Sequence, residues 1–547
     1  MGIRRRSFLK AAGVAPAALT VPGLTAYSCS AAGFVFAHGV ASGDPLRDRV
    51  ILWTRVSPPR GTGATAVSWA VALDRNFSRT VASGETQAVL HRDFCVKVDA
   101  TGLSPGRRYY YRFEALGEQS MVGRTRTLPA GRVDRLALAV ASCSNYRAGF
   151  FNAYRDIARQ DDLFAVIHLG DYIYEYGLDG YASRFAAQLG RVSVPPHELL
   201  TLDDYRLRHA QYKSDPDSQA MHAAHPVIAV WDDHEIANDA WLGGAENHQP
   251  EEENWSARRR AAIRAYDEWM PTRTPDLIDG APLYRAFEFG DLAALIMLDT
   301  RHFARDRQVD AMSLLNEPEK LAAARRDSER ELLGREQFSW LSQQLARSAE
   351  RHRWQVVGQQ IMVAELLIPD LSNVLDEPVA RQRLGDERVD ALLALGGKGY
   401  PLLWDAWDGY AAARRRFLTE LDSTAPSPIV ISGDLHTSVA GNLSLSGDDR
   451  TCCVELVTTS ISSPGFDPYL PTKSKSQLAE AFLGANPHLE WFETAHRGWL
   501  RMELTPDSAT AVWRLVDRVD SRDFSVRVGK RLWTPHRGQS VYGLREV

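Results

Sequence analysis

One stretch constrains the fold more than any other: residues 163–175, which read LFAVIHLGDYIYE. Its first seven residues are almost all apolar, with Val and Ile at the centre, and such a run is typical of a strand buried on both faces. The run ends in Gly170-Asp171. Ligands collect at the carboxyl ends of parallel strands in α/β sheets, and a glycine lets the backbone turn there. Asp171 is therefore a candidate metal ligand at the end of a parallel strand.

The same arrangement recurs at three other places in the chain. The apolar runs at 136–142, 226–231 and 428–432 end in Cys143, in Asp232-Asp233-His234-Glu235 and in Gly433-Asp434-Leu435-His436. A single Asp at a strand end is most often an N-cap or turn residue. Four strand ends that together carry Cys, Asp and His are better explained by one shared site.

Composition and charge limit the class of protein. The chain has 547 residues, 44% hydrophobic and 24% charged, so it is long enough for two or more globular domains. The formal net charge is −5, and the Lys and Arg residues are scattered beyond residue 10 rather than collected in a run. These features argue against a nucleic-acid partner.

The first 30 residues are typical of a twin-arginine signal peptide. Arg5-Arg6 stands directly before Ser-Phe-Leu-Lys, and the apolar run at residues 11–21 is too short to span a bilayer as a mature anchor. We therefore expect the twin-arginine export machinery as a partner, a periplasmic or secreted location, and no transmembrane segment in the mature chain. The alternative is a basic N-terminal helix of a cytosolic protein.

The five cysteines, at positions 29, 95, 143, 452 and 453, lack the regular spacing of a disulfide framework. The neighbours Cys452 and Cys453 would point to opposite faces of a strand. Cys143 is thus available as a metal ligand.

Short strand-like runs separated by turns fill the region from about residue 34 to 130 and predict a small β-sandwich. They lie at 34–40, 50–56, 66–73, 87–98, 109–116 and 123–128. Leu103-Ser104-Pro105-Gly106 followed by Tyr109 resembles the corner of a fibronectin type III-like module, where tyrosines serve packing. A domain boundary is expected near residue 130.

Beyond residue 134 strands alternate with helical stretches, which predicts an α/β sheet. Amphipathic helices are expected at 256–270 and 331–348, and buried strands at 293–298 and 354–357. The stretch 368–403 has no clean periodicity and is interpreted as a lid or insertion. Residues 498–504 and 510–516 predict a hairpin in a second sheet layered on the first.

Three blocks carry a family resemblance: Gly170-Asp171-Tyr172-Ile173-Tyr174, Asp232–Glu235 and Gly433–His436. In this order they resemble the metallophosphoesterase motifs GDxxY, GN(D)H and GHxH. With the stretches 38–45, 407–410 and 458–465, nearly the whole chain is similar to the alkaline phosphatase D (PhoD-like) family. The resemblance implies an α/β fold class: a layered αββα metallophosphoesterase-like sheet domain at 131–547, preceded by the all-β sandwich at 31–130.

The resemblance and the donor chemistry together predict a two-metal site. Asp171 can bridge two cations through its two oxygens, as a phosphoester site requires. The other ligands of the first metal ion would be Cys143, Tyr174 and His436. A thiolate with a phenolate suits Fe³⁺ better than Mg²⁺, and the purple acid phosphatases that share GDxxY use their Tyr in this way. The alternatives are a core aromatic for Tyr174 and a buried thiol for Cys143.

The second metal position offers oxygen ligands. Better-known dinuclear phosphatases supply Asn and two His here, whereas this chain offers Asp233 and Asp434, with Asp232 and Asn238 as further candidates and Gln359 or Gln360 where a His would fall. Such ligands favour Ca²⁺ and disfavour zinc, with Mg²⁺ or another divalent cation as the alternative.

Two residues are assigned to catalysis. His234, beside Asp233, would hydrogen-bond the phosphate or protonate the leaving oxygen, and its alternative role is to orient a ligand. Arg301 follows the buried run 293–298 and faces the same edge of the sheet.

We therefore expect an exported, metal-dependent phosphatase that hydrolyses phosphate monoesters or diesters by attack of a metal-activated oxygen. No Asp-Ser-Ala/Thr block suggests a phosphoserine intermediate. The nearest rival, which the same resemblance includes, is a phosphodiesterase or phospholipase D acting on lipid or teichoic-acid-like diesters. The alternative from another functional class is a secreted, non-catalytic metal-binding module. This hypothesis gives no function to His234 and Arg301.

Overall fold

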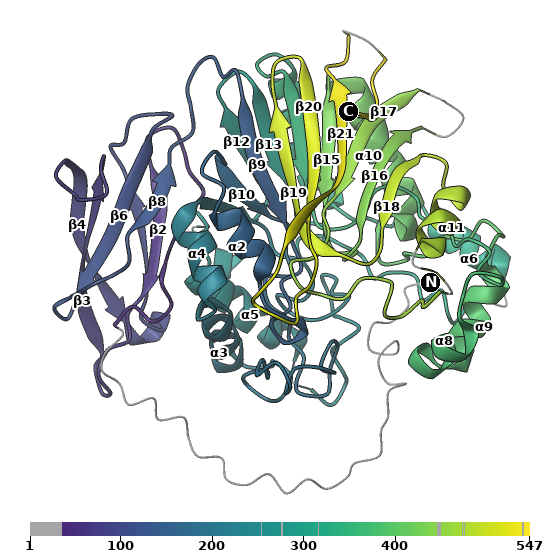
Figure 1. Cartoon of the computed structure of the whole chain (residues 1–547), viewed down its shortest axis with the longest axis horizontal. Coiled ribbons are helices and arrows are strands. Elements are labelled where there is room, and N and C mark those ends of the chain that lie inside the picture. Colours follow the sequence, from purple (N-terminus) through teal and green to yellow (C-terminus); the bar gives the residue numbers. More distant parts are fainter. Residues whose placement is uncertain are drawn as a thin grey trace, which may run out of the picture.

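The computed structural model describes residues 35–547 except 253, 275–276, 315–316, 446–449, 473, 475 and 539–540. The signal peptide expected at residues 1–30 lies outside the described residues. The described chain forms two large sheets that pack face to face, with helices on both outer faces and a smaller sheet at one side (Figure 1). The expected α/β fold with an all-β N-terminal region is confirmed.

The first sheet has ten strands in the order β22-β21-β20-β19-β9-β10-β11-β1-β2-β5. Its centre, β9 to β1, is parallel, and β19 runs antiparallel beside β9. Every residue of β9, β10 and β11 is buried, which explains their continuous apolar sequences. The strands are β1 (Val40–Gly43), β2 (Val50–Arg55), β5 (Cys95–Ala100), β9 (Leu136–Ala141), β10 (Ala165–His168), β11 (Pro226–Ala229), β19 (Arg497–Leu504), β20 (Ser508–Val516), β21 (Val526–Pro535) and β22 (Arg545–Glu546).

The second sheet has seven strands in the order β12-β13-β14-β15-β17-β16-β18, and β13, β14, β15 and β17 are parallel. Its inner face joins the first sheet in one hydrophobic core, which contains Ile167, Val356 and Ile431. Val357, the next residue along β14, belongs to the core on the opposite face, as strand alternation requires. The strands are β12 (Arg285–Phe289), β13 (Ala293–Met297), β14 (Trp354–Gly358), β15 (Pro428–Ser432), β16 (Ser438–Ser444), β17 (Thr451–Val457) and β18 (Leu489–Glu493).

The N-terminal sandwich shares one of its two sheets with the large domain. Its outer sheet is β3 (Ala64–Ala72), β4 (Thr80–Val89), β6 (Arg108–Ala115), β7 (Glu118–Gln119) and β8 (Gly123–Arg126). It packs on β1, β2 and β5 through a core that includes Leu52, Val67 and Tyr111. Tyr109 is buried, and its hydroxyl accepts from Ser104 N at 2.7 Å, so this tyrosine serves packing as predicted.

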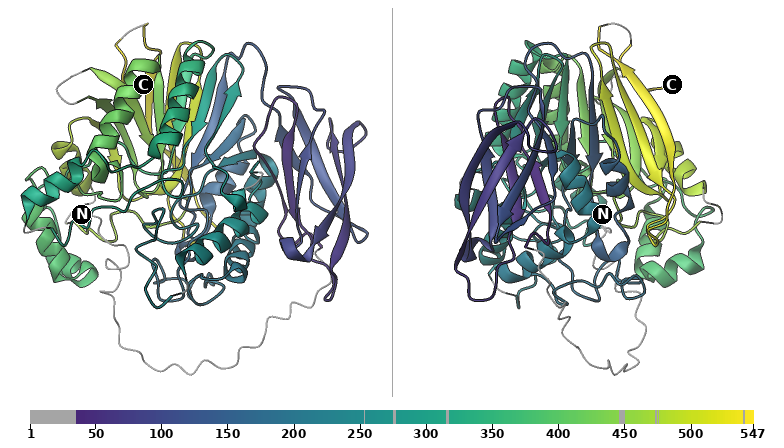
Figure 2. Two further views of the ribbon diagram at one scale, coloured as in Figure 1. Left: turned by 180° about the vertical axis from the view of Figure 1, so that it is seen from behind. Right: turned by 60° about the vertical axis from the view of Figure 1, so that its left-hand side comes forward.

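Helices cover both outer faces of the paired sheets. Contacts with the first sheet come from α2, α4 and α5, with α3 packed on α5. Contacts with the second come from α7, α10 and α11, whereas α6, α8 and α9 gather at the end of the molecule opposite the sandwich (Figures 1 and 2). The helices are α2 (Asn152–Ala158), α3 (Leu202–Lys213), α4 (Pro216–Ala224), α5 (Trp255–Trp269), α6 (Pro318–Arg326), α7 (Gly334–Ala349), α8 (Glu377–Leu384), α9 (Asp386–Leu395), α10 (Ala411–Thr424) and α11 (Gln477–Ala485).

Three details of the predicted secondary structure were wrong. The expected strand at 87–98 is two strands, because Asp93 and Phe94 adopt left-handed backbone conformations between β4 and β5. Residues 35–38 form a turn, and the first strand begins only at Val40. The predicted hairpin β19–β20 exists, but it extends the first sheet beside β9 instead of forming a second layer.

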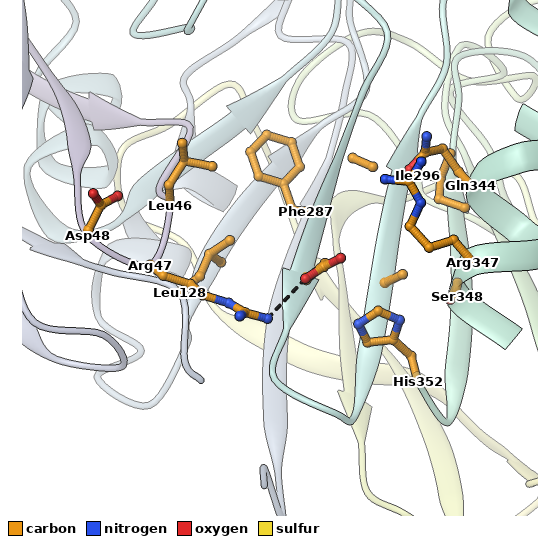
Figure 3. Close-up of a pocket in the computed structure, with 13 residues that line it drawn as sticks. Leu46, Arg47, Asp48, Leu128, Phe287, Ile296, Gln344, Arg347, Ser348 and His352 are labelled. Atoms are coloured by element: carbon orange, nitrogen blue, oxygen red, sulfur yellow. Dashed lines mark hydrogen bonds and ion pairs between the residues drawn. The ribbon is translucent and has the colours of Figure 1, made fainter. Parts of the chain in front are cut away.

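A groove of about 450 Å³ lies where the loop between β1 and β2 meets β12 and α7 (Figure 3). Arg47 reaches across it to Glu288 at 2.9 Å, and the pair ties the sandwich to the second sheet. None of the predicted metal ligands lines this groove. The predicted metal ligands lie instead at the ends of the parallel strands. Among the described residues no helix combines the length and apolar character needed to cross a membrane.

Candidate metal centre

The carboxyl ends of parallel strands from both sheets bring the predicted ligands together. Cys143 follows β9, Asp171 follows β10 and Asp233 follows β11, whereas Asp434 and His436 follow β15 of the second sheet. Ligand atoms of Cys143, Asp171 and His436 lie within 4.8 Å of one another, and so do carboxylate oxygens of Asp171, Asp232, Asp233 and Asp434. Asp171 belongs to both groups, which is the position expected of a bridging ligand.

The glycines of the two Gly-Asp pairs let these strand ends approach closely. A β-carbon on Gly170 would lie 2.4 Å from Asp232 Cβ, and one on Gly433 would lie 2.8 Å from Ser142 Cβ. Real side chains do not tolerate such distances, so both positions require glycine. The Gly-Asp pattern in the sequence thus reflects packing between strand ends as well as the turn itself.

Backbone strain is concentrated at the predicted ligands. The φ angles of Cys143, Asp171, Asp434 and His436 are +61°, +54°, +59° and +62°, in the left-handed region that residues other than glycine rarely adopt. Each such residue costs about 1–3 kcal/mol and persists where surrounding contacts hold it, typically at functional sites. Left-handed residues also occur at turns elsewhere, such as Asp93 and Phe94, so the strain supports a site here together with the residue types.

The first group joins a thiol, a carboxylate, a phenol and an imidazole. Tyr174 Oη donates to Asp171 Oδ2 at 2.9 Å and lies 3.1 Å from His436 Nε2. All four side chains are at most 5% exposed. Burial raises the pKa of the Cys143 thiol well above its usual value, and Asp171 adds to this effect. Deprotonation of this thiol needs a nearby positive charge, which a cation bound between these donors would provide.

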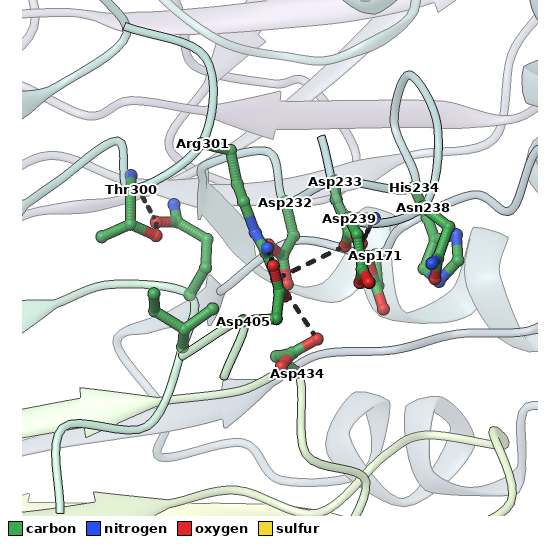
Figure 4. A network of polar contacts seen from close by, with 12 residues as sticks. Asp171, Asp232, Asp233, His234, Asn238, Asp239, Thr300, Arg301, Asp405 and Asp434 are labelled. Carbon is green, nitrogen blue, oxygen red and sulfur yellow. Dashed lines mark hydrogen bonds and ion pairs between the residues drawn. The ribbon is translucent and has the colours of Figure 1, made fainter. Parts of the chain in front are cut away.

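The second group concentrates negative charge in a buried space (Figure 4). Burial raises the pKa of the Asp232 carboxyl well above its usual value, against the attraction of Arg301. Asp232 Oδ2 and Asn238 Oδ1 are buried and have no hydrogen-bond partner among the described residues. Buried oxygens without donors and several converging carboxylates are what a hard cation requires, so the residues present fit such an ion.

Arg301 lies within the carboxylate cluster and is fully buried. Its Nε donates to Asp232 Oδ1 at 2.5 Å and its Nη1 to Asp405 Oδ2 at 2.6 Å, and Nη2 lies 3.5 Å from Asp434 Oδ1. Figure 4 shows the guanidinium pointing toward these acids. Arg301 thus faces the site from β13, as its position at the strand end predicted.

Comparisons with known proteins agree with this geometry. A model of the PhoD-like phosphatase family matches residues 138–513, and a model of the PhoD-like phosphatase N-terminal domain matches 24–129. Alkaline phosphatase D of Bacillus subtilis (strain 168) is 36% identical over 539 residues, which cover 94% of this chain and 84% of that protein. The chain belongs to the PhoD-like phosphatase family. A solved structure described as "Structure of PhoD" matches with a TM-score of 0.80 at 34% identity and covers 94% of this chain and 93% of that chain.

As a PhoD-like phosphatase the protein is a phosphoester hydrolase, and the described site contains its candidate metal-binding clusters. His234 is fully buried, and a nitrogen of its ring lies within 4.8 Å of carboxylate oxygens of Asp171 and Asp233. Its Nδ1 lies 2.6 Å from Glu175 Oε2, and its ring packs 4.3 Å from that of Tyr174, measured between centroids. Burial lowers the pKa of His234, but the carboxylates of Asp171, Glu175 and Asp233 outweigh it and raise the pKa to about 10.

Sequence reasoning missed two glutamates that support the candidate site. Glu175 accepts from His234 and also from Asn238 N at 2.9 Å and Asn247 Nδ2 at 2.6 Å. Glu235 accepts from the backbone nitrogens of Asp171 and Asp232 at 3.0 and 2.7 Å, so one carboxylate holds two strand ends. Glu235 lies inside a motif block and Glu175 directly follows one, but their roles depend on contacts with other strand ends.

Two aspartates near the cluster were also missed. Asp239 and Asp405 have carboxylate oxygens within 4.8 Å of one of Asp233. Asp405 also accepts from Arg305 Nη2 at 2.5 Å. Asp239 directly follows the candidate Asn238, whereas Asp405 follows a stretch without a motif and had no sequence signal.

Gln359 and Gln360 support the scaffold in this structure. Gln360 Oε1 accepts from Thr300 N at 2.9 Å, and Gln359 Nε2 donates to Ser432 Oγ at 2.7 Å. The glutamines hold the turns that carry Arg301 and Asp434. Their amide groups are thus directed at neighbouring turns.

Proposed function

We propose that this PhoD-like phosphatase is exported by the twin-arginine route and hydrolyses phosphate monoesters or diesters at a metal centre formed by the strand-end residues. The observation that carries the proposal is the cluster of four carboxylates, Asp171, Asp232, Asp233 and Asp434, beside the thiol of Cys143. Within the described residues, Arg301 is the cation that salt-bridges three of these carboxylates, so bound cations would balance the remaining charge.

Two different cations suit the two groups of donors. Cys143, Asp171, Tyr174 and His436 would hold Fe³⁺, because a thiolate and a phenolate are strong anionic donors. Asp171, Asp233, Asn238 and Asp434 would hold Ca²⁺, with Mg²⁺ or another divalent cation as the alternative. When bound, such a pair neutralises the phosphate oxygens and favours deprotonation of the attacking water.

The remaining residues orient the substrate and move the proton. His234 donates through Nδ1–H to Glu175, so proton exchange with the substrate takes place at Nε2. The imidazolium would hydrogen-bond the phosphate or protonate the leaving oxygen. Arg301, held by Asp232 and Asp405, presents its guanidinium to the same space and would bind phosphate oxygens.

Metal removal tests this proposal. A calcium-selective chelator should inactivate the enzyme reversibly, because oxygen ligands exchange while the thiolate and phenolate site resists. Calcium should restore turnover and zinc should restore it poorly. Asp171→Asn should abolish turnover, whereas Asp134→Asn, an exposed carboxylate just before β9, should not. Activity that survives exhaustive chelation and Asp171→Asn would refute the metal centre.

The preference between monoesters and diesters needs a separate comparison. Rates with bis(4-nitrophenyl) phosphate and with 4-nitrophenyl phosphate, measured at equal enzyme concentration, distinguish a phosphodiesterase from a phosphomonoesterase. A diester rate that exceeds the monoester rate would favour the lipid or teichoic-acid-like diester alternative. If neither compound is hydrolysed, the remaining hypothesis is a non-catalytic metal-binding module.

A further inference from the structure

Tyr181 contacts a candidate ligand from a segment to which no chemistry has been assigned. It lies between β10 and α3 and is 4% exposed. Its hydroxyl is 3.0 Å from His436 Nδ1 and donates to the Pro464 carbonyl at 2.9 Å. His436 Nδ1 is itself 3.1 Å from the same carbonyl. The hydroxyl, the imidazole nitrogen and the carbonyl therefore form a closed triangle.

The chemistry of this triangle determines which imidazole nitrogen carries the proton. A carbonyl oxygen only accepts, so His436 Nδ1 next to it must be the protonated nitrogen. The single hydroxyl hydrogen of Tyr181 points to Pro464, so its oxygen accepts from Nδ1–H. In the neutral imidazole, which is the form that binds a metal, Nε2 of His436 then carries the lone pair. This nitrogen lies 3.1 Å from Tyr174 Oη and 3.8 Å from Asp171 Oδ2, in the first group of donors.

We propose that Tyr181 is a positioning residue that holds His436 with Nε2 directed at the metal; this inference rests on the proposed function, because it requires a cation at the first site. The hydrogen bond fixes the tautomer and the ring plane of the ligand. It also makes Nε2 a stronger electron donor, as carboxylates and carbonyls do for other metal-bound histidines.

Packing holds Tyr181 in place for this role. Its ring stacks on that of His436 at 24° with centroids 5.9 Å apart, and on that of Tyr174 at 29° and 6.1 Å. Tyr469 packs on it at 24° and 6.3 Å. The hydroxyl of Tyr181 therefore has a fixed position relative to the first group of donors.

Two buried arginines anchor the backbone that leads to Tyr181. Arg208 donates to the carbonyls of Tyr174 and Tyr176, and Arg147 donates to those of Gly177 and Leu178. Both arginines are at most 2% exposed. They connect the stretch with Asp171 and Tyr174 to the stretch with Tyr181, so the ligands and the positioning residue belong to one rigid unit.

The test uses the full chain, purified with its own metal. Elemental analysis and the visible spectrum are recorded first, and loss of iron to a ferric chelator is then followed for wild type, Tyr181→Phe and Tyr469→Phe. Phenylalanine keeps the ring and removes only the oxygen. We expect iron loss about 10- to 100-fold faster from Tyr181→Phe, a shifted charge-transfer band, and a lower kcat at unchanged KM. Tyr469→Phe should match wild type in all four measurements.

A second variant covers the case in which Tyr181→Phe does not fold. 3,5-Difluorotyrosine at position 181 keeps the ring and the hydroxyl but weakens the oxygen as an acceptor, so this variant should lose iron faster than wild type. Iron retention and a spectrum equal to wild type in every variant that folds would overturn the inference and leave the proposed metal site intact. A wild-type protein without any metal would overturn both.

Discussion

Glu175→Gln removes one negative charge beside His234 while it keeps the volume of the side chain. The two oxygens of Glu175 accept from His234 Nδ1, Asn238 N and Asn247 Nδ2, at 2.6, 2.9 and 2.6 Å. All three partners are donors, so the new amide group must turn a donor toward one of them. The least costly arrangement places the amide opposite His234 Nδ1, which must then lose its proton and accept.

The size of the effect follows from this lost contact. A hydrogen bond to a charged group contributes about 1.5–3 kcal/mol, which corresponds to about 1–2 pKa units for His234. Burial already lowers the pKa of His234, and Glu175 is one of the carboxylates that raise it to about 10. Without this charge the pKa falls. If protonated His234 is the active form, the alkaline limb of the pH profile moves to lower pH by about 1–2 units.

Two substrates with different leaving groups provide the assay. Loss of a general acid costs about 10²- to 10⁴-fold when the leaving oxygen needs a proton. The alkyl oxygen of glycerol phosphate needs that proton, whereas 4-nitrophenolate leaves as a stable anion. We therefore expect Glu175→Gln to reduce kcat much more for glycerol phosphate than for 4-nitrophenyl phosphate.

The matched control is Glu455→Gln. Glu455 is also fully buried and accepts from Val363 N, Ala364 N and Ser432 Oγ, but it does not touch His234. It measures the general effect of losing a buried carboxylate. The contrary outcome for Glu175→Gln is that kcat falls equally for both substrates and the alkaline limb of the pH profile does not move. This result would refute His234 as the general acid and leave Glu175 with a purely structural role.

Two further predictions concern packing and export. Gly170→Ala should destabilise the protein by about 2–6 kcal/mol, because it adds backbone strain and a clash with Asp232. The control is Gly61→Ala, which has a similar φ of +85° but open space around it and should cost only about 1–2 kcal/mol. Similar unfolding free energies of the two variants in denaturant titrations would contradict this prediction. Arg5→Lys with Arg6→Lys should trap the protein in the cytoplasm of a host that has the twin-arginine machinery, with Arg60→Lys as the exported control, and cell fractionation decides the outcome.

The strand ends could be predicted from sequence because the relevant pattern is local. A buried apolar run followed by Cys or Gly-Asp marks the end of a parallel strand, and parallel strand ends meet at one edge. Cys143, Asp171 and Asp233 were therefore brought together correctly, because they follow three strands of the first sheet. Asp434 follows β15 of the second sheet, so its approach to them depends on how the two sheets pack. The nature of the ions that they bind stays a prediction.

The parts that sequence did not predict depend on contacts between distant segments. Tyr181 meets His436 across 255 residues, and its own neighbours in sequence show no motif. Strand β19 pairs with β9 across more than 300 residues, and strand alternation alone cannot tell which sheet a hairpin joins. Asp405 likewise reaches the site from a segment without periodicity. Such residues become visible only when the whole fold is known.

The most direct test of the mixed metal centre is the visible spectrum of the concentrated wild-type protein together with its elemental analysis. A phenolate and a thiolate on Fe³⁺ have charge-transfer bands at low energy, which zinc, magnesium and calcium cannot produce. We predict a coloured protein with stoichiometric iron, a band removed or strongly shifted by Tyr174→Phe, a spectrum altered by Cys143→Ser, and colour retained in His234→Ala despite lower turnover. A colourless and fully active preparation without iron would contradict the account.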